Sequence, residues 1–313
     1  MKKKFAVSIG LSAVCLAAFS AGALWAPSVG AQEKLHGRVI LFGVDGLSTE
    51  GISDANAPNV RALMRSGSWT MHMRAVRPTS SAANWGSMIM GAPVELNSVT
   101  NNDWRSDKTP YPPACQSAPG IFPTVLGLEH EQHPEAKIGF FTDWGVYAHL
   151  FEPDAATKVV EHGSSHEDVF RQALAYLESD RPEVMVIHMD TVDDAGHGKG
   201  WGGPEYLAAV AEVDEQLGRL LATLDRLDLR KSTTVLLVSD HGGRGTHHGG
   251  DSIEEIEIPW VISGPGIRVN YEIKDPALMT YDTAATLARI LDLKRSPCWR
   301  ARSIDEAFVK PKK

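Results

Sequence analysis

The fold of this chain is constrained most by short apolar runs that recur along the sequence and are separated by helical patterns. Each run is apolar at consecutive positions, which is typical of a strand buried on both faces. Such strands occur in parallel sheets that helices cover on each side. The runs are Val39–Val44, Ile138–Phe141, Val184–Met189 and Thr233–Val238, and Pro259–Ser263 is a further candidate strand.

Helical patterns lie between these runs. The strongest opens at Pro204, and proline is favoured in the first turn of a helix. It then carries apolar residues at three- and four-residue spacing, namely Leu207, Val210, Val213, Leu217, Leu220 and Leu224. His166–Leu177 and Asp282–Leu291 show weaker patterns. Strands that alternate with helices predict an α/β fold, a three-layer α/β/α sandwich with a mostly parallel central sheet.

The composition fits one large packed domain. Of 313 residues, 43% are apolar and 22% are charged, which excludes a disordered chain, a collagen and a coiled coil. The formal net charge of −8 argues against a nucleic-acid-binding surface. No internal repeat is present. We expect residues 32–313 to form a single domain, with a loop-rich insertion at about 92–135 where few residues are periodic.

Residues 1–31 have the features of a secretory signal peptide, with three early lysines, an apolar run and small residues at 29–31. Cleavage after Ala31 would leave 28 basic and 39 acidic residues, a formal charge of −11. An N-terminal membrane anchor is the alternative, because the run approaches spanning length. A lipoprotein signal at Cys15 is disfavoured, because the residues before this cysteine lack the usual pattern. We expect an exported protein, periplasmic or secreted, without a stable membrane span after cleavage.

Two cysteines, Cys115 and Cys298, remain after this cleavage. An even pair in an exported protein predicts a disulfide. A zinc–thiolate site is disfavoured, because the two are far apart in sequence and no C-x-x-C motif is present.

Acidic residues and histidines follow three of the apolar runs, where each strand would end. They are Asp45 after the first run, Asp190, Asp193, Asp194 and His197 after the third, and Asp240 and His241 after the fourth; His247 and His248 follow in a glycine-rich loop. The carboxyl ends of parallel strands share one edge, where ligands bind. A single aspartate there is often a helix cap. The repeated combination of carboxylate and imidazole favours zinc or a similar divalent ion, and its number of groups favours two ions.

A hydroxyl-rich segment, Arg77–Trp85, precedes an apolar helical pattern. This places its serines at a helix N-terminus, where backbone N–H groups and the helix dipole attract anions. An ordinary serine N-cap is the alternative interpretation.

Five segments in order, GVDG, PTSSAANWGSMIMG, DTVDDAGH, SDHGG and HHGG, resemble the alkaline phosphatase superfamily. They are most similar to its type I phosphodiesterase/nucleotide pyrophosphatase branch. The resemblance covers about residues 38–293 and implies an alkaline phosphatase-like fold. The pattern P-T-x-[ST]-x-x-N implies that Ser81 is the nucleophile and that the amide of Asn84 contacts phosphate.

The resemblance also implies two metal sites. One ion would be held by Asp193, His197 and His248, and the other by Asp45, Asp240 and His241 with the Ser81 oxygen beside it. Zinc is the expected metal. His247 is an alternative to His248, and Asp190 and Asp194 are expected to support the site or its turn. Three carboxylates against two divalent ions leave a local charge of about +1, which can bind a phosphate ester even on an acidic protein.

The sequence departs from the family pattern at two places. Trp85 follows Asn84 where the branch commonly has histidine, and only six residues separate His241 from His248 where relatives often have a long insertion. Trp85 and Trp104 could stack on a nucleobase or aryl leaving group, although burial is the commoner outcome for tryptophan. His188 lies inside an apolar run and is expected to be a core residue.

The predicted function is an exported two-metal hydrolase of small phosphoric esters with a phospho-serine intermediate. The resemblance favours phosphodiester or pyrophosphate bonds over monoesters. A phosphomonoesterase and a non-catalytic exported protein that binds metal or a phosphoryl ligand are the alternatives. A sulfatase is disfavoured, because the segment at Cys298 does not supply the motif that forms formylglycine. The oligomeric state is not predicted.

Overall fold

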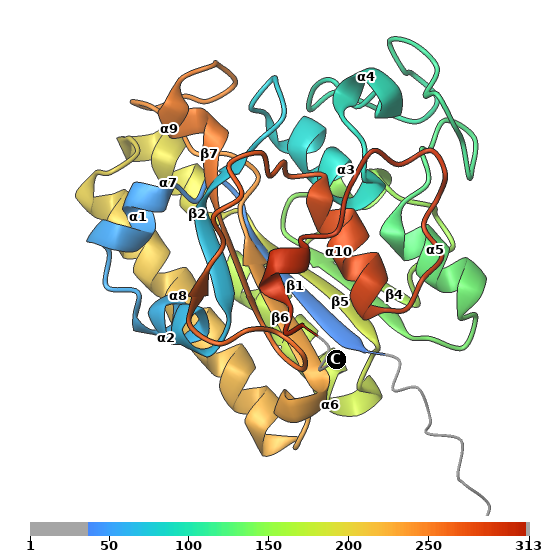
Figure 1. The fold of residues 1–313 in the computed structure, drawn as a ribbon. Coiled ribbons are helices and arrows are strands. Elements are labelled where there is room, and N and C mark those ends of the chain that lie inside the picture. Colours follow the sequence, from blue (N-terminus) through green and yellow to red (C-terminus); the bar gives the residue numbers. More distant parts are fainter. Residues whose placement is uncertain (1–36, 311–313) are drawn as a thin grey trace, which may run out of the picture. The chain divides into compact units, whose positions relative to one another are not determined.

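A central sheet of eight strands organises the computed structural model, which describes residues 37–310. The strand order is β4-β3-β5-β1-β6-β7-β2-β8, and β1 lies in the middle of the sheet (Figure 1). The strands are β1 (Arg38–Val44), β2 (Ser68–Arg74), β3 (Ile138–Thr142), β4 (Lys158–Val160), β5 (Val184–Met189), β6 (Thr233–Val238), β7 (Glu257–Ser263) and β8 (Tyr271–Glu272). The predicted signal peptide, residues 1–31, lies outside the described residues.

Four of the apolar runs form parallel strands, β1, β3, β5 and β6, whereas β4 and β8, which pair in parallel with β3 and β2, were not predicted. Strand β1 pairs in parallel with β5 and β6, and β3 pairs in parallel with β4 and β5. The fifth candidate, Pro259–Ser263, is part of β7, but β7 runs antiparallel to both β6 and β2. Strand β2 is buried only at alternate positions over much of its length and therefore lacks a continuous apolar run. The "mostly parallel" prediction is confirmed, with an antiparallel section at one side.

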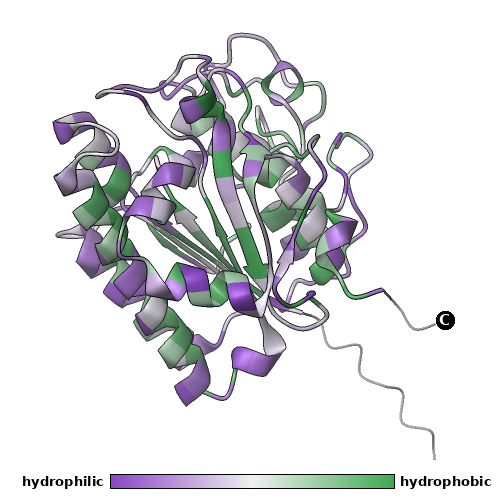
Figure 2. Cartoon of the chain, turned by 60° about the vertical axis from the view of Figure 1, so that its left-hand side comes forward, coloured by the Kyte–Doolittle hydropathy of each residue, from purple (hydrophilic) through white to green (hydrophobic). Residues whose placement is uncertain are grey.

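Helices cover both faces of the sheet. Alternate residues of β1 belong to different cores: Val39 and Leu41 pack on one face, whereas Ile40 and Phe42 pack on the other. One face carries α3 (Ser81–Met90), α5 (Val125–Gln132) and α10 (Asp282–Ile290). The opposite face carries α2 (Pro58–Ser66), α6 (His166–Asp180) and α8 (Pro204–Arg226). Hydrophobic residues line the strands and the inner sides of these helices, whereas hydrophilic residues face outward (Figure 2). The predicted α/β/α sandwich is confirmed.

Short helices complete the fold at the edge where the parallel strands end. They are α1 (Thr49–Asp54), α4 (Val94–Asn97), α7 (Thr191–Lys199) and α9 (Ile253–Ile256). Single 3₁₀ turns occur at Tyr147–His149, Arg230–Ser232 and Asp305–Ala307, and Arg230–Ser232 directly precedes β6, at the opposite edge of the sheet. None of the described helices has the length and apolarity needed to cross a membrane.

The loop-rich segment between α4 and α5 is tied to the C-terminal part of the chain. Residues 98–124 contain only turns and isolated bridges. The predicted disulfide between Cys115 and Cys298 is present, with the two Cα atoms 6.3 Å apart. Beside it, the indole Nε1 of Trp299 donates to the carbonyl of Pro123 at 2.8 Å. The disulfide therefore constrains a segment that has little secondary structure of its own.

Candidate active site

Three aspartates converge where β1, β5 and β6 end. Asp45 directly follows β1, and its backbone N–H continues the ladder by donating to Met189 of β5 at 2.9 Å. Gly46 then adopts a positive φ of 66°, and its N–H donates to Asp240 Oδ1 at 3.2 Å. A Cβ at position 46 would lie 2.7 Å from Asp193 Oδ1, so a side chain would collide with this carboxylate. Glycine at this turn therefore allows the three carboxylates to meet.

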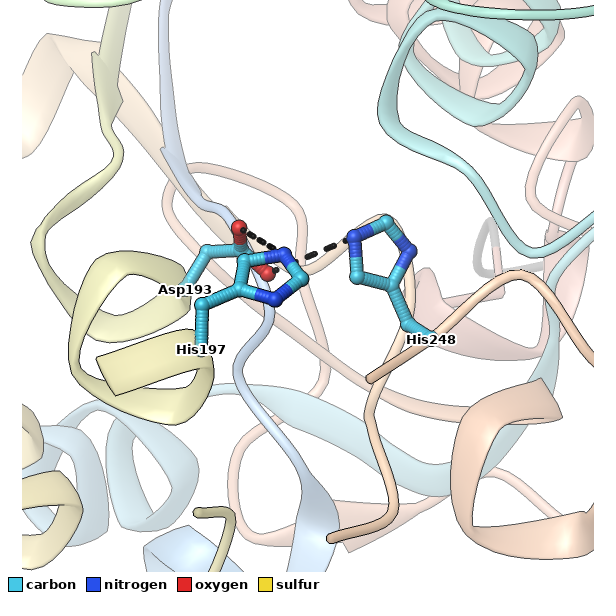
Figure 3. Close-up of side chains that lie close together, drawn as sticks. All are labelled: Asp193, His197 and His248. Carbon is cyan, nitrogen blue, oxygen red and sulfur yellow. Dashed lines mark ion pairs between the residues drawn. The ribbon is translucent and has the colours of Figure 1, made fainter. Parts of the chain in front are cut away.

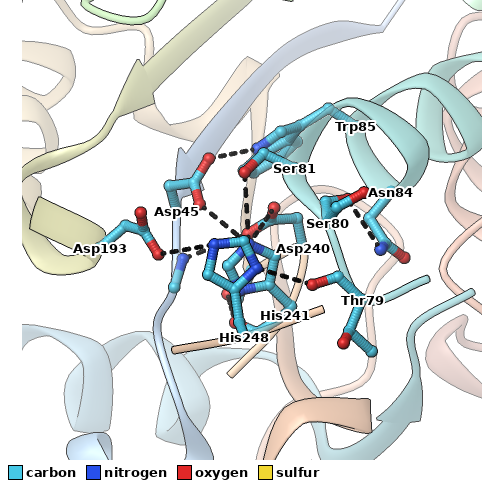
Figure 4. A network of polar contacts seen from close by, with 12 residues as sticks. Asp45, Thr79, Ser80, Ser81, Asn84, Trp85, Asp193, Asp240, His241 and His248 are labelled. Atoms are coloured by element: carbon cyan, nitrogen blue, oxygen red, sulfur yellow. Dashed lines mark hydrogen bonds and ion pairs between the residues drawn. The ribbon is translucent and has the colours of Figure 1, made fainter. Parts of the chain in front are cut away.

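Asp45, Asp240 and His241 form a fully buried group, which we call the inner cluster. One potential ligand atom from each lies within 4.8 Å of the others. His241 Nε2 lies 3.4 Å from Asp45 Oδ1 and 3.2 Å from Asp240 Oδ2. All three residues have zero exposure, and side chains of the surrounding network converge on them (Figure 4).

Asp193, His197 and His248 form a second group, which we call the outer cluster (Figure 3). Asp193 and His197 lie four residues apart on α7 and therefore share one helix face. His197 Nε2 lies 3.2 Å from Asp193 Oδ2, and His248 Nε2 lies 3.9 Å from Asp193 Oδ1. The rings of His241 and His248 stack with centroids 3.8 Å apart, so the two clusters adjoin.

The three histidines share one hydrogen-bonding arrangement. In each, Nδ1 contacts a backbone carbonyl: Gly242 O for His241 at 2.8 Å, Thr246 O for His197 at 2.9 Å, and Thr79 O for His248 at 2.8 Å. A carbonyl only accepts, so Nδ1 carries the proton and Nε2 of the neutral ring has a free lone pair. In all three, Nε2 is the atom that faces the aspartates, as a metal ligand requires.

The three aspartates each have one oxygen without a hydrogen-bond partner among the described residues. These atoms are Asp45 Oδ1, Asp193 Oδ1 and Asp240 Oδ2, and all are buried. Unpaired buried carboxylate oxygens are costly unless a cation satisfies them. Together with the three free Nε2 atoms, they make a donor set of oxygen and imidazole nitrogen that fits zinc.

Ser81 is the first residue of α3, and its hydroxyl faces the inner cluster. Ser81 Oγ lies 3.3 Å from His241 Nε2 (Figure 4). Ser80 precedes it as the N-cap, so the prediction of serines at a helix N-terminus is confirmed. Thr79 links this turn to the outer cluster, because its carbonyl accepts from His248 and its hydroxyl accepts from the N–H of Gly249 at 3.1 Å.

A family model described as "Type I phosphodiesterase / nucleotide pyrophosphatase" matches residues 39–257. The chain belongs to this family. Relatives include ectonucleotide pyrophosphatase/phosphodiesterase family member 1 of Mus musculus, 26% identical over 220 residues, and venom phosphodiesterase of Macrovipera lebetinus, 26% identical over 225 residues. Each alignment covers 65% of this chain, and the chain spans about a quarter of the length of these relatives.

Solved structures of the same family confirm the alkaline phosphatase-like fold. Murine ectonucleotide pyrophosphatase/phosphodiesterase 5, in an inactive form in complex with AMP, superposes with a TM-score of 0.74 at 14% identity. This match covers 87% of the present chain and 100% of that chain. The human form of that protein also has a TM-score of 0.74.

The acid–base properties of this candidate site follow from the crowding of buried carboxylates. Burial raises the pKa of Asp45, but the hydrogen bond from His188 and the charge of His188 outweigh burial and bring the pKa to about 2. Burial and the charge of Asp45 raise the pKa of Asp193 to about 9, and the same two causes raise the pKa of Asp240 well above its usual value. Burial lowers the pKa of His248 to about 4. The site therefore favours the neutral form of His248. A bound cation would be needed to keep Asp45, Asp193 and Asp240 ionised together.

Asn84 does not have the position that the family pattern implied. Its amide donates to the carbonyls of Val76, Pro78 and Ser80, and its Oδ1 accepts from the N–H of Val76 at 2.7 Å. The side chain has zero exposure. Because both ends of the amide are occupied by backbone, Asn84 shapes the turn before α3 and is not directed at a ligand.

Two residues near Asp45 have roles that sequence reasoning missed. Trp85 is fully buried, and its Nε1 donates to Asp45 Oδ2 at 2.8 Å, so it cannot stack on a substrate. His188 is buried as expected, but its Nε2 contacts the same Asp45 oxygen at 3.1 Å and its Nδ1 contacts Thr142 Oγ1 at 3.0 Å. The departure at position 85 was visible in the sequence. Its connection to Asp45 depends on how α3 packs on β1.

The other residues that the sequence singled out lie at different places around the site. Trp104 is buried, which is the outcome that the sequence favoured over stacking on a substrate. His247 is exposed, and the structure places His248 beside Asp193. Asp194 is on the surface, with its carboxylate 3.3 Å from His166 Nε2. Asp190 lies at the start of α7 and, with Asp45 and His188, forms a third group of potential ligand atoms within 4.8 Å.

Proposed function

We propose that this protein is a metal-dependent hydrolase of small phosphodiesters or pyrophosphates, with Ser81 as the nucleophile. The observation that carries the proposal is the position of Ser81 Oγ, 3.3 Å from His241 Nε2, at the N-terminus of a helix and beside two adjoining Asp/His clusters. Membership of the family and the names of the relatives favour diester and pyrophosphate bonds over monoesters.

The inner and outer clusters are each proposed to hold one divalent ion, with zinc as the expected metal. Asp45, Asp240 and His241 would hold one ion beside Ser81, and Asp193, His197 and His248 would hold the other. Such ions lower the pKa of a nearby hydroxyl and stabilise the negative charge that develops on the phosphoryl and leaving oxygens.

The residues of the chain position and carry the covalent step. Ser81 Oγ loses its proton to solvent and attacks phosphorus, the phosphorus–oxygen bond to the leaving group breaks, and the leaving group departs with the electron pair of that bond. The N-terminus of α3 places a positive partial charge next to the phosphoryl group. Water then attacks the phospho-serine, the bond between phosphorus and Ser81 Oγ breaks, and a proton released by that water returns Oγ to the hydroxyl form.

Ser81→Ala tests the nucleophile directly. We expect turnover of bis(para-nitrophenyl) phosphate to fall at least about 10³-fold, as for loss of other nucleophiles, while zinc content stays unchanged. Ser80→Ala is the matched control, because the neighbouring hydroxyl has no hydrogen-bond partner among the described residues. It should keep activity within a few-fold of the unmodified protein. Full activity of Ser81→Ala would remove the proposal, and a parallel assay with para-nitrophenyl phosphate tests the preference for diesters.

Export is proposed on two observations. The named relatives are ectoenzymes and venom enzymes, and the disulfide between Cys115 and Cys298 is of a kind that persists in oxidising compartments. N-terminal sequencing of protein recovered outside the cytoplasm should find Gln32 as the first residue. An N-terminus at Met1 would contradict cleavage after Ala31.

A further inference from the structure

Trp201 lies between α7 and α8, outside every motif that indicated the function. It contacts three segments that carry residues of the two clusters: the turn after β1, helix α7, and residues 242–248, which we call the histidine loop. We propose that Trp201 is a positioning residue that holds the histidine loop against α7 and so completes the outer cluster. This inference rests on the proposed role of the outer cluster as a metal site.

The first set of contacts joins Trp201 to the histidine loop. Its backbone N–H donates to the carbonyl of Gly245 at 2.8 Å. Its indole ring lies against Gly243, where even a Cβ atom would overlap the ring. The ring centroid is 6.1 Å from that of His248. Trp201 therefore contacts the histidine loop at His248, its potential metal ligand, and at the glycines that precede it.

The second set joins Trp201 to α7. A Cβ at Gly196 would lie 2.7 Å from the indole, so the ring packs directly on the helix backbone. The ring also meets His197 edge to face, with centroids 5.3 Å apart and an interplanar angle of 84°. Both histidines of the outer cluster thus pack on the same indole.

The third contact anchors the indole itself. Trp201 Nε1 donates to the carbonyl of Gly46 at 2.8 Å. Gly46 is the residue whose turn brings Asp45, Asp193 and Asp240 together. The hydroxyl of Tyr206 also donates to this carbonyl, at 2.9 Å. Removing the indole N–H therefore leaves Gly46 O with a partner.

The histidine loop needs such an anchor because its own structure is weak. It contains Gly242, Gly243 and Gly245 and forms only a short turn in which Arg244 and His247 bridge. At its start, Gly242 N–H donates to the carbonyl of Glu255 at 3.0 Å and Gly242 O accepts from His241 Nδ1. Nearer His248, the polar connections include the donation of His197 Nδ1 to Thr246 O and of His248 Nδ1 to Thr79 O. Glycine gives the unfolded loop high conformational entropy, so fixing His248 near Asp193 depends on contacts from outside the loop.

Calorimetric titration of EDTA-treated protein with Zn²⁺ alone tests the inference. We expect two binding events in the unmodified protein. In Trp201→Ala the event assigned to the outer cluster should weaken about 10–100-fold, the usual cost of losing a residue that supports metal ligands, while the other event is unchanged. Trp201→Phe keeps an aromatic ring at this position and should weaken this binding event less. His248→Ala should remove the same event, and adding Trp201→Ala to it should change nothing further.

Two further variants separate positioning from general stability. Gly243→Ala displaces the indole without removing it and should reproduce the selective loss, even if Trp201→Ala fails to fold. Trp69→Ala removes another partly buried tryptophan, on β2, and should leave both events unchanged. The unfolding midpoint of each metal-free variant is measured in parallel.

The results distinguish the inference from the proposed function. Unchanged Zn²⁺ affinities in Trp201→Ala and Gly243→Ala, with two events in the unmodified protein, would overturn only the role of Trp201. Equal weakening of both events, in step with a lower unfolding midpoint, would also overturn it, because that pattern indicates general destabilisation. Absence of Zn²⁺ binding by the unmodified protein would overturn the metal-dependent function and this inference with it.

Discussion

The inner and outer clusters use the same residue types but are built on different supports. Asp45 and Asp240 lie at the ends of adjacent paired strands, and all members of the inner cluster have zero exposure. In the outer cluster, the side chain of His197 is 43% exposed, and His248 belongs to the histidine loop. One cluster is therefore positioned by the sheet, and the other by a short helix and a loop.

This difference should decide how each ion behaves. Paired central strands open only with global unfolding, whereas glycine-rich loops open locally at much lower free energy. An ion in the inner cluster would be enclosed among buried groups that stay in place. An ion in the outer cluster would depend on the closure of the histidine loop.

Matched changes of one aspartate in each cluster should show the largest contrast. Asp240→Asn should lower turnover of bis(para-nitrophenyl) phosphate at least about 10³-fold, because a buried ligand charge cannot be replaced by solvent. Asp193→Asn should cost about 10–100-fold and recover partly with excess Zn²⁺. Asp194→Asn, a surface change beside Asp193, is the control and should remain near full activity. Equal losses and equal recovery in the two variants would show that the clusters do not differ in this way.

Trp85→Phe tests whether support of the inner cluster can be removed without affecting the outer cluster. The indole N–H and His188 both contact Asp45 Oδ2, which leaves Oδ1 directed at the rest of the inner cluster. Losing the N–H should weaken one Zn²⁺ binding event about 10–100-fold and spare the event that depends on His248. Trp260→Phe removes another buried indole donor, to Thr283, and serves as the control. A loss confined to the His248-dependent event would contradict the assignment.

Removal of metal should reveal the smallest effect, a difference in rate. On mixing the zinc-loaded protein with excess chelator, we expect two phases of release, with the outer ion leaving about 10-fold faster or more, because local loop opening precedes global opening. Trp201→Ala should accelerate only the fast phase. A single phase in the unmodified protein would show that both ions leave through one common opening.

Much of the parallel sheet was predictable because burial on both faces requires continuous apolar residues. Strands β1, β3, β5 and β6 carry such runs. Strand β2 escaped prediction because its pattern is half-buried, and the direction of β7 could not be inferred, since apolar content does not depend on the direction of a strand. The disulfide between Cys115 and Cys298 was predicted from the even number of cysteines left after signal cleavage together with the expected export.

The site was predictable where a residue's place follows from local geometry. Asp45 and Asp240 end strands that share an edge, and Asp193 and His197 lie one helical turn apart, so their proximity follows from strand pairing and helix pitch. The choice of His248 over His247 came only from the family pattern. The phosphate contact expected of Asn84 is not supported, because its amide is used by the backbone before α3.

By itself, the sequence determined which strand ends carry the acidic and imidazole groups, because hydrophobic periodicity and chain spacing act locally. Only the tertiary structure decided how those groups are oriented. Trp85 and His188 meet at one oxygen of Asp45, although all three lie far apart along the chain. Trp201, which closely follows α7, joins that helix to Gly46 and to the histidine loop, and both of these are distant in sequence. Such contacts depend on how helices pack on the sheet, and no local pattern encodes that packing.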